Sequence, residues 1–577
     1  MASFNHANDT GSPPAAAATP TLGVGPLPLD AGEYRRQGRQ VVDFIADYYD
    51  RIDEYPVRPT VAPGFLARQL PDTAPSWPEP DALASALRDV RELILPGVTH
   101  WQSPRHFAHF AATASNVGAL GEALAAGLNI NPFTWAASPA ATELETVVTD
   151  WLGKALHLPE QLLFCGGGGG TLLGTSCEAM LCTIVAARDR KLAELRGDER
   201  MGDLVVYCSD QTHFSFKKAA HVAGIRRANC RVIPTCRESG FTLSPAALQA
   251  AVCADEAAGR VPLFLCATVG TTPTAAVDPL RELCAAVAGH GVWVHVDAAY
   301  AGAACICPEF SHIAAGAEAV DSFSTNPHKW LLANMDCCAL WVRHPTALVA
   351  ALGTDDDVIL KDAAASAVVD YKDWQVALSR RFRALKLWLV LRCHGVEGLR
   401  GFVRAHVRMA AAFEAMVRAD PRFEVPVPAR FGLVCFRLRP ATDAADDGTA
   451  EATTNELNRR LLEAVNATGR AYMSCAVVGG MYVLRCAIGN SLTEERHVRE
   501  AWSIVQEQAD AVLTPAGAGV APAARSKGRT VEDARRMETS VHEKWSSPPR
   551  TAYHVIRSYA LAFVPRVGVP RIFLSMD

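Results

Sequence analysis

Short apolar runs alternate with helical patterns through the middle of the chain. The apolar runs are bounded by polar or turn-forming residues, which is typical of buried strands, and the segments between them carry apolar residues every three or four positions, which predicts helices. The expected strands are 162–165, 204–208, 263–269, 292–296, 320–324 and 339–342, and the expected helices are 178–190, 245–254 and 278–288. This alternation favours an α/β domain with a mostly parallel sheet.

The flanking regions follow other patterns. Apolar residues on one side of 31–53 predict a helix, and 82–94 predicts a second helix beyond a proline-rich stretch. A further helical region is expected from about residue 371. The segment 474–490 predicts two strands around a Gly-Gly turn, and 494–512 predicts a closing helix, so a smaller α+β domain is expected here.

These patterns divide the chain into five parts. The tail from residue 514 differs from the rest because it carries ten Lys and Arg against five Asp and Glu. The expected parts are a disordered leader (1–28), an N-terminal helical segment (29–95), a large domain (96–395), a smaller C-terminal domain (396–513) and a basic tail without an assigned role (514–577).

Composition narrows the class of protein. Of 577 residues, 49% are hydrophobic and 20% are charged, which is typical of a globular chain. A net charge of −5 gives no reason to expect nucleic-acid binding, and no apolar run is long enough to span a membrane. The N-terminus lacks a signal-peptide pattern, and the 17 cysteines form no CxxC pair. We therefore expect a cytoplasmic protein with buried thiols and no metal site.

Two charged residues lie where predicted strands end. Lys329 follows the strand 320–324 between His328 and Trp330, where apolar surroundings would lower its pKa, as a Schiff-base lysine requires. Asp297 ends the strand 292–296 and is followed by small residues that leave room for a flat ring. A carboxylate here can keep a pyridinium nitrogen protonated. The alternatives are a surface lysine and a helix-capping aspartate.

A glycine run supplies a candidate phosphate site. Gly166–Gly170 precede Thr175-x-x-Glu178, a capping box that places a helix start where backbone N–H groups can bind phosphate. A nucleotide P-loop is the competing interpretation, but Thr175 stands where that motif requires lysine. A structural turn is the other alternative.

Two more strand ends carry polar side chains. His213 follows the strand 204–208, where its ring can stack on a planar cofactor or cap a helix, and Thr271 and Thr272 follow the strand 263–269. Together with the phosphate site, Asp297 and Lys329, these residues match the requirements of pyridoxal phosphate.

With these residues in place, the sequence resembles the plant aromatic L-amino-acid decarboxylases, the tyrosine/tryptophan decarboxylase branch of the group II pyridoxal-phosphate decarboxylases. The resemblance covers roughly residues 27–512. It rests on the stretches Glu33–Gly38, Val42–Tyr49, His100–Pro104, Ser138–Glu145, His295–Gly302, Asn326–Trp330 and Tyr371–Trp374.

The resemblance implies fold type I of the pyridoxal-phosphate enzymes, in an obligate homodimer with shared active sites and N-terminal helices that wrap the partner. It implies that Lys329 binds pyridoxal 5'-phosphate as a Schiff base, that Asp297 pairs with the ring nitrogen and that His213 stacks on the ring. The other cofactor-binding residues that it implies are Ser176, Cys177, Thr272, Ala299, Asn326 and His328.

One loop departs from the family. Relatives place a tyrosine between the strand at Trp341 and Tyr371, but 351–367 contains no tyrosine or phenylalanine, and Val358 or Ile359 takes that position. An aliphatic side chain cannot protonate the quinonoid at Cα. In the related aldehyde synthases a phenylalanine here diverts the quinonoid to oxygen, which gives aldehyde, ammonia and peroxide. We expect a decarboxylase, with an aldehyde synthase as the alternative and a non-catalytic protein on the same fold as a remoter one.

The resemblance also outlines the substrate pocket. Trp101 and Phe133 occupy aromatic lining positions, although packing in the core is the alternative for each. Ser379 stands where indole-preferring relatives carry glycine, and Ala112 replaces a hydroxyl residue. Ser379 favours tyrosine, dopa or phenylalanine over tryptophan, and the hydroxyl lost at Ala112 favours the less polar phenylalanine.

Overall fold

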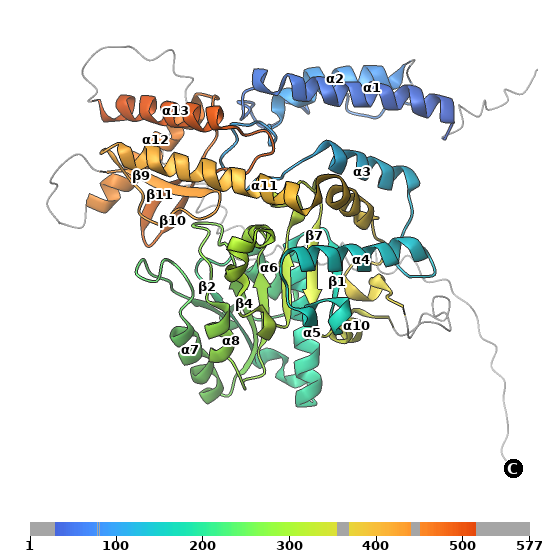
Figure 1. Cartoon of the computed structure of the whole chain (residues 1–577), viewed down its shortest axis with the longest axis vertical. Coiled ribbons are helices and arrows are strands. Elements are labelled where there is room, and N and C mark those ends of the chain that lie inside the picture. The colour runs from blue at the N-terminus through green and yellow to red at the C-terminus, as the bar shows by residue number, and fades with distance from the viewer. Residues whose placement is uncertain (1–28, 78, 80, 355–367, 440–449, 515–577) are drawn as a thin grey trace, which may run out of the picture. The chain divides into compact units, whose positions relative to one another are not determined.

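A seven-stranded sheet forms the centre of the large domain (Figure 1). The computed structural model describes residues 29–77, 79, 81–354, 368–439 and 450–514. The strands are β1 (Gly169–Leu173), β2 (Leu204–Ser209), β3 (Cys230–Ile233), β4 (Val261–Thr268), β5 (Trp293–Asp297), β6 (Ser322–Thr325) and β7 (Cys338–Val342). Their order is β1-β7-β6-β5-β4-β2-β3.

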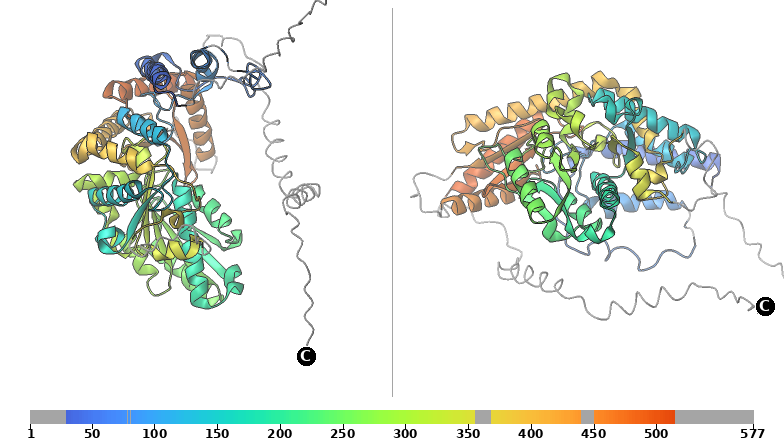
Figure 2. Two further views of the ribbon diagram at one scale, coloured as in Figure 1. Left: turned by 90° about the vertical axis from the view of Figure 1, so that its right-hand side faces the viewer. Right: turned by 90° about the horizontal axis from the view of Figure 1, so that it is seen from below.

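The sheet is mostly parallel, as the sequence pattern predicts. β7 runs antiparallel to both of its neighbours, and β2 to β6 pair in parallel. Every residue of β2, β5 and β7 is buried, because helices flank the sheet (Figures 1 and 2). Burial on both faces explains why these strands appear in the sequence as continuous apolar runs.

Helices precede, connect and follow the strands. Thr175 is the N-cap of α5 as predicted, since its side chain accepts a 3.3 Å hydrogen bond from the Glu178 N–H. The helices up to β7 and just beyond it are α1 (Ala31–Asp50), α2 (Ala82–Asp89), α3 (Asn116–Leu128), α4 (Pro139–Ala155), α5 (Ser176–Leu195), α6 (Phe214–Val222), α7 (Pro245–Ala257), α8 (Leu280–Ala286), α9 (Pro327–Trp330) and α10 (Thr346–Leu352).

The first predicted strand is wrong. Residues 160–166 form two short 3-10 turns, and the strand begins inside the glycine run, at Gly169. A side chain at Gly170 would lie 2.7 Å from Cβ of Thr149 on α4, so glycine lets the strand approach this helix closely. Pairing with β7 stabilises an extended backbone that glycines alone do not favour.

A smaller antiparallel sheet follows. Its order is β10-β11-β9-β8, and Gly479 and Gly480 both have positive φ in the predicted turn. This turn links two strands of the predicted pair. The elements are α11 (Arg383–Ala419), β8 (Phe423–Glu424), β9 (Leu433–Leu438), α12 (Ala450–Ala467), β10 (Ser474–Val478), β11 (Met481–Ala487) and α13 (Glu495–Leu513).

The helix expected from residue 371 starts later. Tyr371–Trp374 form a 3-10 turn, an irregular segment follows, and α11 begins only at Arg383. Buried polar contacts of Arg380 hold this segment against β1, so tertiary contacts override its helical pattern. Within α11, Gly395 is non-helical and kinks the helix beside the predicted domain boundary at 395/396.

Two further features bear on the sequence predictions. The four cysteines at 305, 307, 337 and 338 are buried and free, as expected. Across the part of the chain that the structure describes, none of the helices combines the length and the apolar character needed to cross a membrane.

Candidate active site

Four parallel strands end at one edge of the large sheet, and the predicted site residues follow them. Asp297 is the last residue of β5, and Lys329 lies in α9, just after β6. His213 and Thr272 come soon after β2 and β4. Because the carboxyl ends of neighbouring parallel strands form the usual ligand crevice of an α/β sheet, the fold gathers these side chains as predicted.

Lys329 is only partly buried, and its Nζ lies 6.0 Å from the centroid of the Phe110 ring. Burial lowers the pKa of Lys329, although the negative charge of Asp297 works in the opposite direction. Among the described residues, no side chain or carbonyl accepts a hydrogen bond from this Nζ. The amine is therefore biased toward its neutral, nucleophilic form and is available to a ligand.

Asp297 is buried and faces the same group of residues. Its Oδ1 accepts a 3.1 Å hydrogen bond from the N–H of Ala299, which orients the carboxylate in a local turn. Its charge acts to raise the pKa values of both Lys329 and His213. Asp297 is thus the negative charge that both of these residues sense.

His213 is the N-cap of α6. Its Nδ1 accepts a 3.3 Å hydrogen bond from the Ser215 N–H and lies 2.6 Å from the Ser215 hydroxyl. Burial lowers the pKa of His213, which favours a neutral ring at neutral pH. Because Nδ1 accepts, the proton belongs on Nε2. His213 therefore caps a helix, which is one of its two predicted roles. Its Nε2 has no hydrogen-bond partner among the described residues, so the ring can still stack on a cofactor.

The start of α5 is hydrogen-bonded directly to α9, the helix that carries Lys329 and that we call the lysine helix. Ser176, the first residue of α5, donates a 2.9 Å hydrogen bond from Oγ to Oδ1 of Asn326, the N-cap of α9. Cys177 instead points its thiol toward the carbonyl of Ser215, at 3.9 Å. Free N–H groups of a 20-residue helix thus lie at the site, where they can bind phosphate.

The remaining predicted cofactor residues differ in their contacts. Ala299 is buried beside Asp297, and Thr272 is partly buried. Nδ1 of His328 accepts a 3.0 Å hydrogen bond from the Cys337 N–H, and burial lowers the pKa of His328 to about 4. His328 is therefore a neutral residue whose ring is tied to the backbone before β7.

The four predicted pocket residues fall into two pairs. Trp101 stacks on His106 at 4.9 Å, and the Ala112 carbonyl accepts a 2.7 Å hydrogen bond from Gln102. Phe133 and Ser379 are linked through the irregular segment after Tyr371: the Ser379 hydroxyl accepts a 3.4 Å hydrogen bond from Asn131, and the Phe133 carbonyl accepts one from the Lys372 N–H. Within the described residues, no hydrogen bond or ring contact joins the two pairs.

The structure adds a column of stacked rings that sequence reasoning missed. Phe110 stacks on Tyr300 with centroids 3.6 Å apart, and Tyr300 stacks on Trp330 at 5.0 Å. Trp330 follows Lys329 directly in the sequence, so the column supports the lysine helix from one side. The residues are far apart in the chain, and no local pattern indicated their contact.

This donor set fits pyridoxal phosphate. The unpartnered amine of Lys329, the carboxylate of Asp297 and the imidazole of His213 lie at one sheet edge, beside a helix start that can accept phosphate. These are the groups needed to bind the aldehyde carbon, the ring nitrogen, the ring face and the phosphate. The positions Val358 and Ile359 lie outside the described residues.

Comparisons with known proteins agree with this chemistry. Residues 63–439 match the model of the pyridoxal-dependent decarboxylase conserved domain. A tyrosine decarboxylase from Oryza sativa subsp. japonica is 70% identical over 515 residues, which cover 88% of this chain and 95% of that protein. A phenylacetaldehyde synthase from a Rosa hybrid cultivar is 55% identical, with 84% and 96% covered.

A solved structure shares the fold. The crystal structure of Oryza sativa TDC with PLP and tryptamine superposes with a TM-score of 0.82 at 46% identity, covering 85% of this chain and all of that one. The protein is thus an enzyme that uses pyridoxal 5'-phosphate. With a family model that spans most of its length and a relative at 70% identity, the chain belongs to the pyridoxal-dependent decarboxylases.

Proposed function

We propose that this enzyme removes the carboxylate of an aromatic L-amino acid and releases the arylalkylamine and CO2, with tyrosine, dopa or phenylalanine as preferred substrates. The observation that carries the proposal is the 70% identity to a tyrosine decarboxylase across 95% of that relative. Lys329, Asp297 and His213 at one sheet edge supply the groups that this reaction needs.

Bound pyridoxal phosphate supplies an electron sink for the pair released when the bond between Cα and the carboxylate breaks. Lys329 would hold its aldehyde carbon, because burial favours the neutral amine. Asp297 would hold a proton on the ring nitrogen, and its carboxylate is already oriented by the Ala299 N–H. Ser176 and the start of α5 would hold the phosphate.

His213 would stack on the ring and hold a proton close to Cα. Ser215 fixes the ring tautomer through Nδ1, so Nε2 carries the proton. Since 351–367 contains no tyrosine, we assign to His213, or to a water that it orients, the return of a proton to Cα.

Ser379 and Ala112 carry the substrate preference in this proposal. A serine in place of glycine leaves less room for an indole, and the alanine removes a hydroxyl group from the pocket. The serine thus favours a single-ring substrate, and the lost hydroxyl favours the less polar phenylalanine.

An aldehyde synthase is the second candidate. The aliphatic Val358 and Ile359 favour it, and so does the 55% identity to a phenylacetaldehyde synthase. In that reaction oxygen is the oxidant, and the products are aldehyde, CO2, ammonia and hydrogen peroxide.

One experiment separates the two candidates. The holoenzyme is incubated in turn with L-tyrosine, L-phenylalanine, L-dopa and L-tryptophan, and amine, aldehyde and peroxide are quantified together. Amine without peroxide supports decarboxylation, whereas aldehyde with an equal amount of peroxide identifies the synthase. Full cofactor loading without turnover would instead support a non-catalytic protein. If aldehyde forms, Val358→Tyr and Ile359→Tyr should shift the product toward amine.

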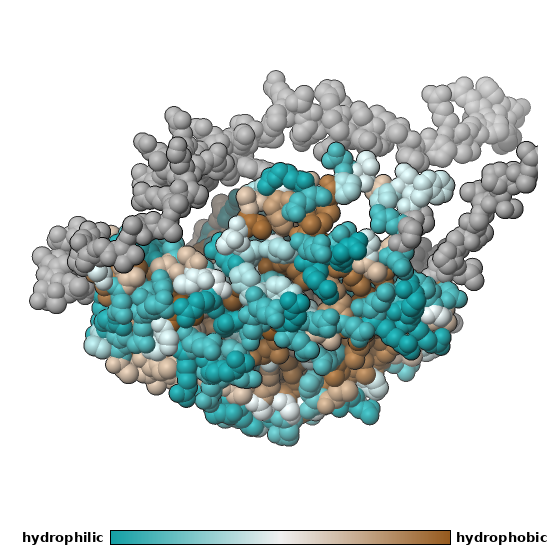
Figure 3. Space-filling view, turned by 90° about the horizontal axis from the view of Figure 1, so that it is seen from above, coloured by the Kyte–Doolittle hydropathy of each residue, from teal (hydrophilic) through white to brown (hydrophobic). Residues whose placement is uncertain are grey.

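We also propose a homodimer with shared active sites, in which the segment 29–95 wraps the partner. α1 has 20 residues and none of them is buried, with Val42 and Ile45 55% and 43% exposed. Leu120, Leu124 and Leu128 of α3 are exposed as well. Hydrophobic residues interrupt the polar surface on the face shown in Figure 3. A helix with no buried residue gains little from packing, so a partner surface would stabilise it.

Light scattering on the eluting protein tests the dimer. The wild type should have twice the mass of the chain, and Val42→Glu/Ile45→Glu should shift the population toward monomer. A wild type that elutes as a monomer would contradict the proposal. The cytoplasmic location and the five-part division stay predictions.

A further inference from the structure

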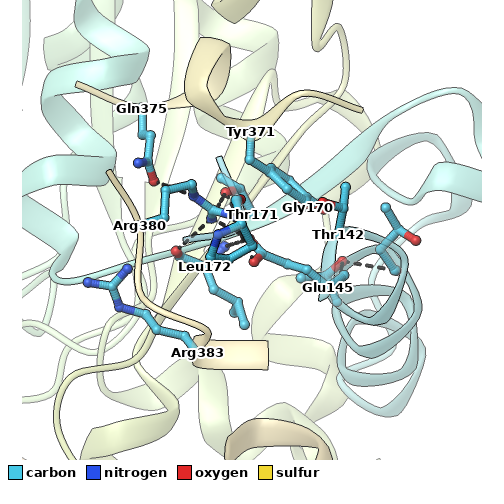
Figure 4. Close-up of polar contacts among 12 residues, drawn as sticks. Thr142, Glu145, Gly170, Thr171, Leu172, Tyr371, Gln375, Arg380 and Arg383 are labelled. Carbon is cyan, nitrogen blue, oxygen red and sulfur yellow. Dashed lines mark hydrogen bonds and ion pairs between the residues drawn. The ribbon is translucent and has the colours of Figure 1, made fainter. Parts of the chain in front are cut away.

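A fully buried ion pair joins α4 to the irregular segment before α11. The side chains of Arg380 and Glu145 are 0% and 2% exposed, and they form two parallel hydrogen bonds of 2.6 and 3.0 Å (Figure 4). The residues are 235 positions apart in the sequence. Removing two charges from water has a large cost that their mutual attraction does not always offset, so such a pair is weak evidence for a role in stability alone.

The Arg380 guanidinium uses its remaining donors as well. It donates to Gln375 at 2.8 Å, to the Leu172 carbonyl at 3.2 Å and to the Pro132 carbonyl at 3.4 Å. Its carbon lies 4.4 Å from the Tyr371 ring centroid. Figure 4 shows these contacts converging from the segment, β1 and α4. A planar group with this many fixed partners has little freedom to move.

These contacts fix two of the predicted pocket residues, Ser379 and Phe133. Arg380 directly follows Ser379, and Pro132 directly precedes Phe133. Asn131 accepts a 2.8 Å hydrogen bond from the Arg380 N–H and donates a 3.4 Å bond to Ser379 Oγ. The Phe133 carbonyl accepts a 2.9 Å bond from the Lys372 N–H. The guanidinium therefore sets the position of Ser379 relative to Phe133.

Ser379 borders an open space. Asn131, Ser379 and Arg380 line a cavity of about 410 Å³ together with neighbouring residues of α3 and the start of α11. The Ser379 side chain is exposed there, whereas Arg380 is buried behind it. Arg380 would thus act on a ligand through its neighbours and not by contact.

We propose that Arg380, held by Glu145, is a positioning residue for ring selectivity: it fixes the spacing between Ser379 and Phe133 and so sets the preference for a phenolic ring over an indole. The inference rests on the proposed function, because it takes Ser379 and Phe133 as pocket residues. Pocket contacts of this kind discriminate between related ligands by about 10–200-fold.

Two variants test the role of Arg380. Arg380→Lys keeps a positive charge beside Glu145 but loses the guanidinium N–H groups that donate to Gln375 and to the Pro132 carbonyl. Arg380→Met/Glu145→Gln removes both charges, so neither variant leaves an unpaired buried charge. The control is Arg231→Met/Asp255→Asn, which removes another bidentate ion pair, between β3 and α7, away from Ser379 and Phe133.

The dissociation constants of tyramine and tryptamine are measured for each holoenzyme, with the absorbance of the cofactor as the signal for binding. Thermal unfolding shows whether each variant is folded. We expect tyramine affinity to fall about tenfold relative to tryptamine affinity in both variants. The control should keep the wild-type ratio. The proposal would be overturned if the folded Arg380→Lys variant or the folded double variant kept the wild-type ratio of tyramine affinity to tryptamine affinity. An equal change of this ratio in the control would overturn it as well.

The test also separates this inference from the proposed function. If the wild type decarboxylates none of the aromatic amino acids, the proposed function fails, but the two dissociation constants still decide the role of Arg380. If the wild type is active and the ratio is unchanged in the variants, only the positioning role fails.

Discussion

The Trp330 indole donates a 3.0 Å hydrogen bond to Nδ1 of His406. Nε2 of His406 lies 3.1 Å from the Asn490 carbonyl, so the ring must be neutral with its proton on Nε2. Burial lowers the pKa of His406 to about 4, in agreement with this assignment. Because Trp330 follows Lys329, one buried imidazole ties α11 to the lysine helix.

Replacing His406 should destabilise the fold. His406→Leu leaves the Trp330 N–H and the Asn490 carbonyl without partners, and we expect the free energy of unfolding to fall by about 2 kcal/mol. Urea unfolding measures this change. His221→Leu, at an exposed position on α6, is the control and should change stability little. Equal stability of the two variants would contradict the buried hydrogen bonds.

Acid should destabilise the protein through three buried histidines. Burial lowers the pKa values of His106, His328 and His406 to about 4, whereas the unfolded chain binds these protons near pH 6.5. Between these values the unfolded state binds more protons, so stability is full above pH 6.5 and is lost as the pH falls toward 4. Urea unfolding at pH 7.5, 5.5 and 4.5 should show this fall, with a smaller slope for His406→Leu.

Asp297→Asn should slow the reaction and leave the fold intact. Asparagine keeps the shape of the side chain but removes the charge that would hold a proton on the cofactor ring. We expect kcat for CO2 release to fall by about 10²–10³-fold. The wild type and the variant are compared at equal cofactor content, as judged by the absorbance of the cofactor. Asp198→Asn, on the surface, is the control. A variant with wild-type kcat would remove Asp297 from the proposed site.

Lys329→Ala should abolish covalent attachment of the cofactor. Borohydride reduction followed by mass spectrometry should add the cofactor mass to the wild type and to the exposed-lysine variant Lys218→Ala, but not to Lys329→Ala. Reduction that labels Lys329→Ala equally would assign the Schiff base to another lysine.

Much of the fold could be predicted because its signals are local. The buried strands β2, β4, β5 and β7 appear as apolar runs, and the capping box at Thr175 and the Gly479-Gly480 turn are short-range features. The grouping of candidate site residues at the ends of strands could be predicted in the same way, since parallel strands bring their carboxyl ends to one edge of the sheet. β1 was missed because its pairing with β7, and not its glycine-rich sequence, makes it extended.

The sequence by itself determined the buried strands β2, β4, β5 and β7, the sheet edge at which the parallel strands end and the residue types at that edge. Only the tertiary structure decided that Arg380 is paired with Glu145, that Trp330 is bonded to His406, and that the segment after Tyr371 is not a helix. The physical reason is that desolvation and buried hydrogen bonding depend on partners that are distant in the chain. Their free energies arise only when the folded core brings these partners together and excludes water.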